Sequence, residues 1–126
     1  MTVLAQSGVC AEARPYASFI AFEWRDGIDR AKARLALAQI PELTQALAEL
    51  YPDTGLCSVV AIGAHAWHDL FGAKPAELNG FPGFADTVIA LPRTDIGGLL
   101  HIRSERQDIN FELAKHIADQ LGALAI

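Results

Sequence analysis

The pattern of hydrophobic and polar positions predicts four strands. Residues 16–24 alternate with a period of two, and both of the resulting faces are largely apolar. Residues 56–62 form a short, β-branched and nearly all-apolar run, which is typical of a central strand buried on both faces. A third strand is predicted over 99–103, and the apolar residues 124–126 are expected to begin a fourth.

Between these strands the apolar positions recur at helical spacing. Residues 28–39 place alanine and leucine side chains on one stripe and basic side chains outside it, which predicts an amphipathic helix. Pro41 is expected to break or kink this helix and to stand in the first turn of a continuation over 43–50.

Two further helices are predicted. The first is short, covers residues 64–71 and is closed by Gly72. The second is expected to begin with a capping box, in which the Ser104 side chain accepts a backbone N–H and Gln107 reaches back. It runs to a stop signal at Gly122 and carries one apolar stripe: Asn110, Leu113, Ala114, Ile117 and Leu121.

The order of the strands and the two long helices predicts an α+β fold of the ferredoxin-like, split βαβ type. This fold is an antiparallel four-stranded sheet with helices on one face. We expect residues 1–126 to form one such domain, because the length is close to the common domain size of about 100–150 residues.

The composition indicates a partner for the uncovered sheet face. Hydrophobic residues make up 52% of the chain and the mean hydropathy is +0.23, which is more apolar surface than a small domain easily hides. A second sheet, from a second domain or a second copy, would complete an α/β sandwich or barrel. The apolar residues 123–126 directly follow a helix, so we expect the chain to be half of a larger unit.

Charge and cysteine usage exclude some classes of function. The net charge of −5 argues against nucleic acid and against an anionic membrane surface. No run reaches the ~18 apolar residues of a spanning helix, and residues 1–10 lack the pattern of a signal peptide. Cys10 and Cys57 are either joined in a single disulfide or, as favoured here, reduced and buried thiols of a cytoplasmic protein.

The four histidines are the first candidates for chemistry. His65 and His68 share one helix face at a spacing that suits a metal, but no second cluster of ligands is visible, and a plain helix surface is the favoured interpretation. His101 lies in a predicted strand. It could serve as a pH-sensitive group or as an axial ligand, but a strand residue hydrogen-bonded across the sheet is the favoured interpretation. His116 is interpreted as a solvated helix residue.

Charged residues near the third strand are the second candidates. The run Arg103, Glu105, Arg106 and Asp108 is either a clamp for a carboxylate or a partner domain, or a salt-bridged junction between strand and helix. The junction is favoured. Residues 93–95 (Arg-Thr-Asp) either belong to a site that lines the long connection over 73–96 or anchor this loop. Such connections are usually functional or packed against a neighbour.

The remaining motifs give no catalytic constellation. Gly97 and Gly98 do not have the spacing of a phosphate loop, and Ser7 and Ser58 lack a nearby histidine and acid. Cys57 is expected to be inert in its strand. From the residues alone, no catalytic or metal-binding residue is assigned.

A set of ordered segments nevertheless carries a family resemblance: Gln6-Ser7-Gly8-Val9; Val59-Val60-Ala61-Ile62-Gly63 with Ala66-Trp67 and Leu70-Phe71-Gly72; Leu78-Asn79-Gly80-Phe81-Pro82; and 99–108 with Asn110-Phe111. Together they resemble the amino-terminal half of the dye-decolorizing (DyP-type) haem peroxidases. The resemblance implies two ferredoxin-like halves whose sheets face each other, with the haem mainly against the carboxyl-terminal half.

The resemblance also implies which residues are missing. The proximal histidine, the distal arginine and the Gly-x-x-Asp-Gly motif of the family have no counterpart here. His101 matches a strand histidine of the first half and not the iron ligand. Gly97 departs from the family, since many members carry an aspartate at this position.

The function implied by the resemblance is peroxide-dependent oxidation of dyes or phenols by a parent haem b enzyme. This segment is expected to be inactive alone, to bind no haem by itself and to need the haem-bearing half or a second subunit. It is expected to form homo-oligomers. Tyr16, Trp24, Tyr51 and Trp67 are candidates for electron transfer, although packing or partial burial is favoured for all four.

Two alternatives remain at this stage. The chain is a stand-alone ferredoxin-like binding module that dimerises through its apolar sheet face, or a small haem-binding or monooxygenase-like α/β-barrel protein. The second alternative requires a ligand on the sheet face, and His101 is the strand candidate for it.

Overall fold

The computed structural model describes residues 4–84, 88–89 and 94–126. Their elements are listed in chain order: β1 (Tyr16–Phe22), α1 (Arg30–Leu50), β2 (Cys57–Ile62), α2 (Ala64–Phe71), β3 (Gly98–Ser104) and α3 (Gln107–Leu121). Each predicted helix and the first three strands are therefore present, with ends shifted by a few residues. Helix α2 ends as predicted, because Gly72 has a φ of 87° that favours glycine.

The sheet has three strands in the order β1-β3-β2, and both pairings are antiparallel. The prediction that 56–62 is the central strand is wrong, because β3 pairs with both of its neighbours while β2 lies at an edge. The residues of a strand show how apolar that strand is. The position of β2 in the sheet depends instead on the crossover connection through α1.

The predicted fourth strand is reduced to a single bridge between Trp24 and Ala125. The amide of Glu23 donates to the Ile126 carbonyl at 3.0 Å, and the Ile126 amide donates back at 2.8 Å. Residues 124–126 thus pair with the extension of β1, on the side of the sheet where a split βαβ fold places its fourth strand. The four-stranded sheet is corrected to three strands plus this bridge, because the pairing spans too few residues for a ladder.

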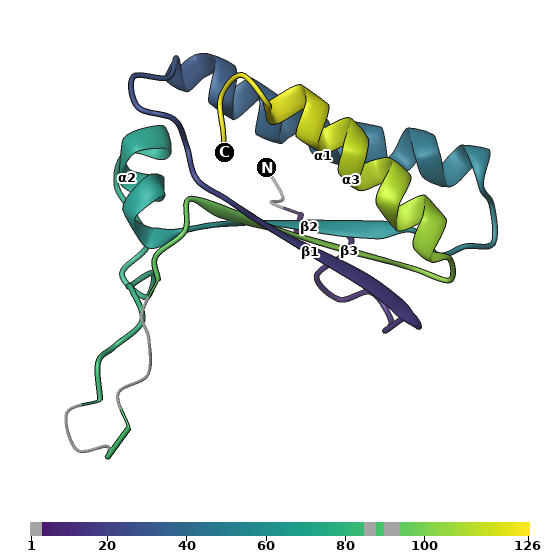
Figure 1. Cartoon of the computed structure of the whole chain (residues 1–126), viewed down its shortest axis with the longest axis horizontal. Helices are drawn as coiled ribbons and strands as arrows, with labels where there is room; N and C mark the ends of the chain where they lie inside the picture. The colour runs from purple at the N-terminus through teal and green to yellow at the C-terminus, as the bar shows by residue number, and fades with distance from the viewer. Residues whose placement is uncertain (1–3, 85–87, 90–93) are drawn as a thin grey trace.

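Helices α1 and α3 both lie on one side of the sheet, and α2 lies at one end of it (Figure 1). The core forms between these helices and the sheet. Its fully buried members include Ile40 of α1, Leu100 and Ile102 of β3, and Leu113 and Ile117 of α3. The alternation of buried and half-buried residues along β3 shows that only one face of this strand contributes to the core.

Helix α1 is continuous through Pro41, so the predicted break there is wrong. Proline removes one backbone donor from a helix. The helix nevertheless buries Ile40, Thr44 and Leu47 on either side of this position, and Asp29 caps its start through bonds to the amides of Ala31 and Lys32. We attribute the tolerance of Pro41 to this burial, which local sequence signals do not include.

The predicted capping box of α3 is also wrong. Ser104 is the last residue of β3, is fully buried, and accepts the Arg106 amide at 3.1 Å, while Gln107 donates to Ser18. The Ser104 hydroxyl also lies 2.7 Å from the buried side-chain oxygen of Asn110. The serine therefore ties the end of β3 to the first turns of α3. Gly122 follows the helix as expected, but in a right-handed conformation.

Gly98→Ala tests the packing of β1 against β3. A Cβ at this position would lie 2.2 Å from the ring of the buried Phe22, so we expect a loss of about 1–3 kcal/mol in the free energy of unfolding. Urea denaturation measures it. Gly83→Ala is the control, because a Cβ there meets nothing within 4 Å, and its expected change is within about 0.5 kcal/mol. Equal stability of the two variants would contradict the described packing.

Candidate functional site

The face of the sheet opposite α1 and α3 is the first candidate site, and we call it the open sheet face. It is formed by alternate residues of the three strands that do not point into the core: Ala17, Phe19, Ala21, Cys57, Val59, Ala61, Leu99, His101 and Arg103. Seven of these nine side chains are apolar aliphatic or aromatic groups or a thiol. No described helix covers this face (Figure 1), but the turn at Gly8 lies against its β2 side, beside Val59 and Arg103.

The centre of the open sheet face is a stacked pair of rings. Phe19 and His101 are direct cross-strand neighbours, and their ring centroids lie 4.2 Å apart with an angle of 16° between the planes. Phe19 is 63% exposed. Burial, and then the positive charge of Arg103, lower the pKa of His101, so the imidazole is neutral at pH 7. His101 is therefore a strand residue, but the predicted hydrogen bond of its side chain across the sheet is wrong, because its described contact is the stack on the Phe19 ring.

Arg103 does not join the other charges of its run. Its guanidinium donates to the Gly8 carbonyl, which ties the amino-terminal residues to the open sheet face. The rest of the run forms exposed pairs at the junction of strand and helix, with Glu105 bonded to Arg14 at 3.0 Å and Arg106 to Asp108 at 2.6 Å. The hydrogen bond from Arg106 is the main cause that lowers the pKa of Asp108. The predicted salt-bridged junction is confirmed without Arg103.

A second candidate is a cleft of about 460 Å³ between the end of β1 and helix α2. His65 lines this cleft and pairs with Glu23 at 3.1 Å, and both His65 and His68 are exposed. The lining also holds charges of both signs, from Arg25, Arg30, Asp26 and Asp69. Within 4–84, 88–89 and 94–126 there is no group of three or more side chains placed to hold a metal ion, so the metal interpretation of the histidine pair gains no support.

No ring contact described for this structure joins two of the aromatic candidates for electron transfer. Trp24 packs edge-on against Phe22, and Trp67 donates its indole N–H to the Ala73 carbonyl at 3.2 Å. Tyr51 donates to Glu112 at 3.1 Å, and this bond is the main cause that raises the pKa of the tyrosine. Partial burial is confirmed for these three residues.

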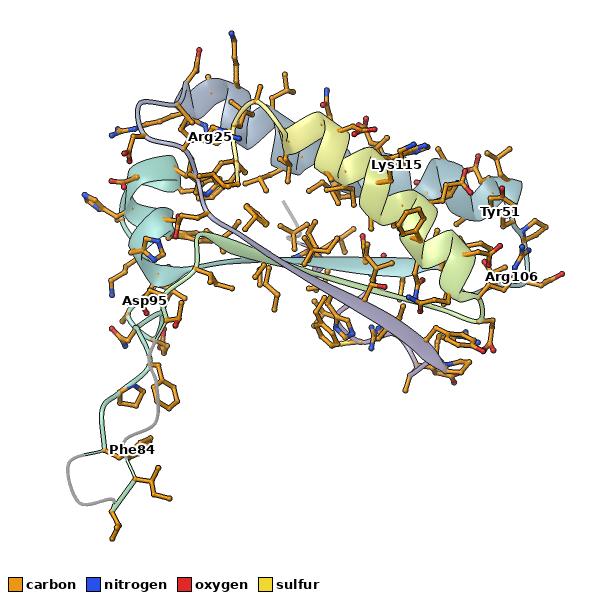
Figure 2. The ribbon with its side chains drawn as sticks, viewed as in Figure 1. Arg25, Tyr51, Phe84, Asp95, Arg106 and Lys115 are labelled. Atoms are coloured by element: carbon orange, nitrogen blue, oxygen red, sulfur yellow. The ribbon has the colours of Figure 1, made fainter. Side chains whose placement is uncertain are left out.

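Tyr16 is different, because it is 46% exposed at the start of β1, so the prediction of burial is wrong for it. Figure 2 shows Tyr51 beside Arg106 at one end of the molecule, and the guanidinium lies 5.5 Å from the ring centroid. His116 is exposed on α3, as predicted.

Both cysteines are free thiols, but the prediction that they are buried is wrong for Cys10, which is exposed. Cys57 is half-buried, at the edge of the open sheet face. Of the predicted loop residues, Thr94 and Asp95 are exposed, and Arg93 lies outside the described residues.

The described part of the 73–96 connection projects to the side of the sheet away from α1 and α3 (Figures 1 and 2). Phe81 and Phe84 contact each other there, with ring centroids 5.7 Å apart, and both side chains are exposed. The connection therefore adds apolar surface on the same side as the open sheet face.

The described residues do not form a complete haem site. A haem pocket needs an axial ligand and apolar walls that enclose the ring. His101 offers a neutral imidazole, but it is stacked on Phe19 in an open face that supplies one wall only. The apolar cavity of about 230 Å³ lies elsewhere, between β1, α3 and the last residues, and the larger cleft is lined by charges. We therefore derive no step of chemistry through haem in this chain.

Comparison with known proteins gives a consistent result. The family described as "Dyp-type peroxidase, N-terminal" matches residues 6–125 of the chain. A dye-decolorizing peroxidase of Rhodococcus erythropolis is 36% identical over 110 residues, which cover 86% of this chain and 32% of the relative. One of Mycobacterium tuberculosis is 39% identical over 88 residues, covering 69% and 26%. The chain thus spans about a third of the length of the curated relatives it matches.

Solved structures share the fold. The encapsulated DyP-type peroxidase of Mycobacterium smegmatis superposes with a TM-score of 0.87 at 31% identity, over 96% of this chain and 39% of that one. DyPB of Rhodococcus jostii RHA1 gives 0.87 at 28% identity, over 100% and 41%. A variant of that protein was solved in complex with heme. None of the described helices is long and apolar enough to cross a membrane.

The lowered pKa of His101 can be measured directly. We expect its imidazole to titrate below the ordinary histidine range in an NMR titration, and Arg103→Gln to raise the value, because one of the two causes is then removed. Arg106→Gln is the control, since Arg106 pairs with Asp108. The folded chain binds this proton less readily than the unfolded chain. The contribution of His101 to stability is therefore present above the ordinary histidine pKa and is lost as the pH falls through the lowered pKa of the folded chain. An ordinary value in the wild-type chain would contradict the partial burial of the ring.

Proposed function

The chain belongs to the Dyp-type peroxidase family, as its amino-terminal domain, and we propose that it acts as the sheet-bearing half of a two-part peroxidase. The observation that carries this proposal is the open sheet face. It is apolar and lies opposite the helices, so a complementary sheet stacked on it would bury it as in an α/β barrel. The complementary half is the partner, and the length of the relatives supports its existence.

The parent activity in this proposal is peroxide-dependent oxidation of dyes or phenols. Haem b, held by the complementary half, supplies the redox chemistry when bound. This chain contributes no catalytic residue. Its residues pack against the other half, exclude water from the interface and fix the position of that half.

The electrostatics of the open sheet face support a packing role. A charged group buried at an interface is costly unless it is paired. His101 at the centre is neutral at pH 7, and the charge of Arg103 is already directed at the Gly8 carbonyl. A complementary apolar sheet therefore meets few unpaired charges.

Three further points belong to the same proposal. Residues 1–126 form one domain, which the continuous core of β1, β3, α1 and α3 supports. A reducing, cytoplasmic setting agrees with the two free thiols. Homo-oligomers of the parent protein are expected, and the exposed apolar residues of the 73–96 connection offer surface for them.

The stand-alone dimeric module remains the second candidate, because the open sheet face of one copy can also pack on that of another. The monooxygenase-like alternative needs His101 as a ligand, and the stacking of this ring on Phe19 gives no support for that role.

The first test mixes the 126-residue chain with hemin, hydrogen peroxide and a phenolic dye. We expect no sharp Soret band and no turnover above that of hemin alone, because the residues described here do not enclose the ring. Absorbance spectra and dye bleaching measure the two outcomes. Robust turnover with a defined Soret band would contradict the proposal and favour the haem-binding alternative.

The second test compares two phenylalanines of similar exposure on opposite sides of the molecule. Phe19 is 63% exposed on the open sheet face, and Phe111 is 68% exposed on α3. We expect Phe19→Asp to weaken both the self-association of the chain and its binding of a fluorescent apolar dye, because the substitution places a charge at the centre of the open sheet face. Phe111→Asp should leave both unchanged. Sedimentation velocity and fluorescence of a bound apolar dye measure these effects, and equal responses would contradict a docking role for the open sheet face.

A further inference from the structure

The amide of Gln6 occupies the outer edge of β2. Its side-chain nitrogen donates to the Val60 carbonyl, and its side-chain oxygen accepts the Val60 amide, both at 2.9 Å. A carboxamide offers the same donor and acceptor as a peptide unit. Gln6 therefore gives Val60 the two hydrogen bonds that a paired residue on a neighbouring strand would give it.

Neighbouring residues hold this amide in place. The Val9 amide donates to the Gln6 carbonyl at 3.0 Å, which closes a turn directly after Gln6. Gly8 within that turn is buried, and a Cβ there would lie 2.3 Å from the Ser58 carbonyl oxygen of β2. Arg103 donates to the Gly8 carbonyl from the open sheet face. We call residues 6–9 the edge strap, because they contact both the edge of β2 and the adjacent face.

Strand β2 lacks the features that usually prevent an edge strand from pairing with another chain. Edge strands usually avoid pairing with other chains by means of charged side chains, proline or a bulge. The sequence of β2 is Cys-Ser-Val-Val-Ala-Ile, which contains neither a charge nor a proline. Its β-branched and apolar residues are those favoured in paired strands. A groove of about 330 Å³ beside Gln6, lined by residues of α1 and β2, leads to the same edge.

We infer that the edge strap closes a strand-addition site on β2, and that this site takes the β2 strand of a second copy when the Gln6 amide is removed. Two β2 edges brought together antiparallel are related by a two-fold axis, so each supplies the groups that the other lacks. No charge on β2 opposes this pairing. The site is distinct from the open sheet face, because it uses backbone groups at the edge of the sheet.

The test is hydrogen exchange at the Val60 amide, measured by NMR over a range of protein concentrations. In Gln6→Ala at low concentration we expect exchange about tenfold faster than in the wild-type chain, because the Val60 amide loses its hydrogen bond to the Gln6 side-chain oxygen. At high concentration the protection should return together with a dimer in sedimentation velocity. In the wild-type chain, exchange at Val60 should not depend on concentration, even if copies associate through the open sheet face.

Gly8→Ala is a second variant that leaves Gln6 intact. Its methyl group would press on the Ser58 carbonyl and lift the strap, so the same concentration dependence is expected. Gln45→Ala is the matched control, because Gln45 lies on α1 beside the same groove but bonds only to Glu49 among the described contacts. This control should behave as the wild-type chain does. Protected amides of Leu100 and Ile102 in β3 show that each variant is folded.

Three results would overturn the inference. Unchanged exchange at Val60 in Gln6→Ala would show that the amide does not close the edge. Fast exchange at every concentration, without a dimer, would show that the open edge does not accept a second β2 strand. A dimer in which Val60 stays unprotected would place the contact elsewhere and would also contradict the inference.

Discussion

The structure depends on the pairing of β3 with both of its neighbours. Because side chains alternate between the two faces of a strand, the register of β3 decides which residues enter the core. Leu100 and Ile102 are at most 1% exposed against the helices, while His101 between them points to the open sheet face. A slip of one residue would exchange these positions and place an imidazole among aliphatic side chains. The core and the docking face are thus two results of one pairing.

Local patterns were sufficient to predict the elements of this fold. The two-residue period of 99–103 and the helical stripe ending at Leu121 reflect burial on one side, which the sequence records directly. Most of the predictions that were wrong concerned interactions between distant residues, and the capping box of Ser104 and Gln107 is the local exception. Pro41 remains in a helix because the flanking turns are buried. Strand β2 lies at an edge because α1 carries the chain from β1 past the position that β3 fills.

The candidate site was only partly predictable for the same reason. His101 and Arg103 stood out by residue type, but their partners did not, because Phe19 and Gly8 are 82 and 95 positions away in the chain. Gln6 and Gly8 belonged to a segment that resembled the family, yet nothing in its residue types indicated a contact with β2. A glutamine that serves as a peptide unit has no distinctive sequence pattern. The signal that could have pointed to it is the unguarded edge of β2, which requires a partner of some kind.

The open sheet face and the edge of β2 differ in one respect that matters for assembly: the face has no covering helix, whereas Gln6 occupies the edge. The open sheet face presents side chains, whose burial is favourable but weakly directional, so a complementary sheet is needed to select one orientation. The edge of β2 presents backbone groups, which would accept almost any extended strand. The hydrogen bonds of Gln6 close the edge of β2, whose backbone groups are less selective for a partner than the side chains of the open sheet face. For the proposed docking of the open sheet face on one complementary sheet, an occupied edge is therefore better protection than a smaller face.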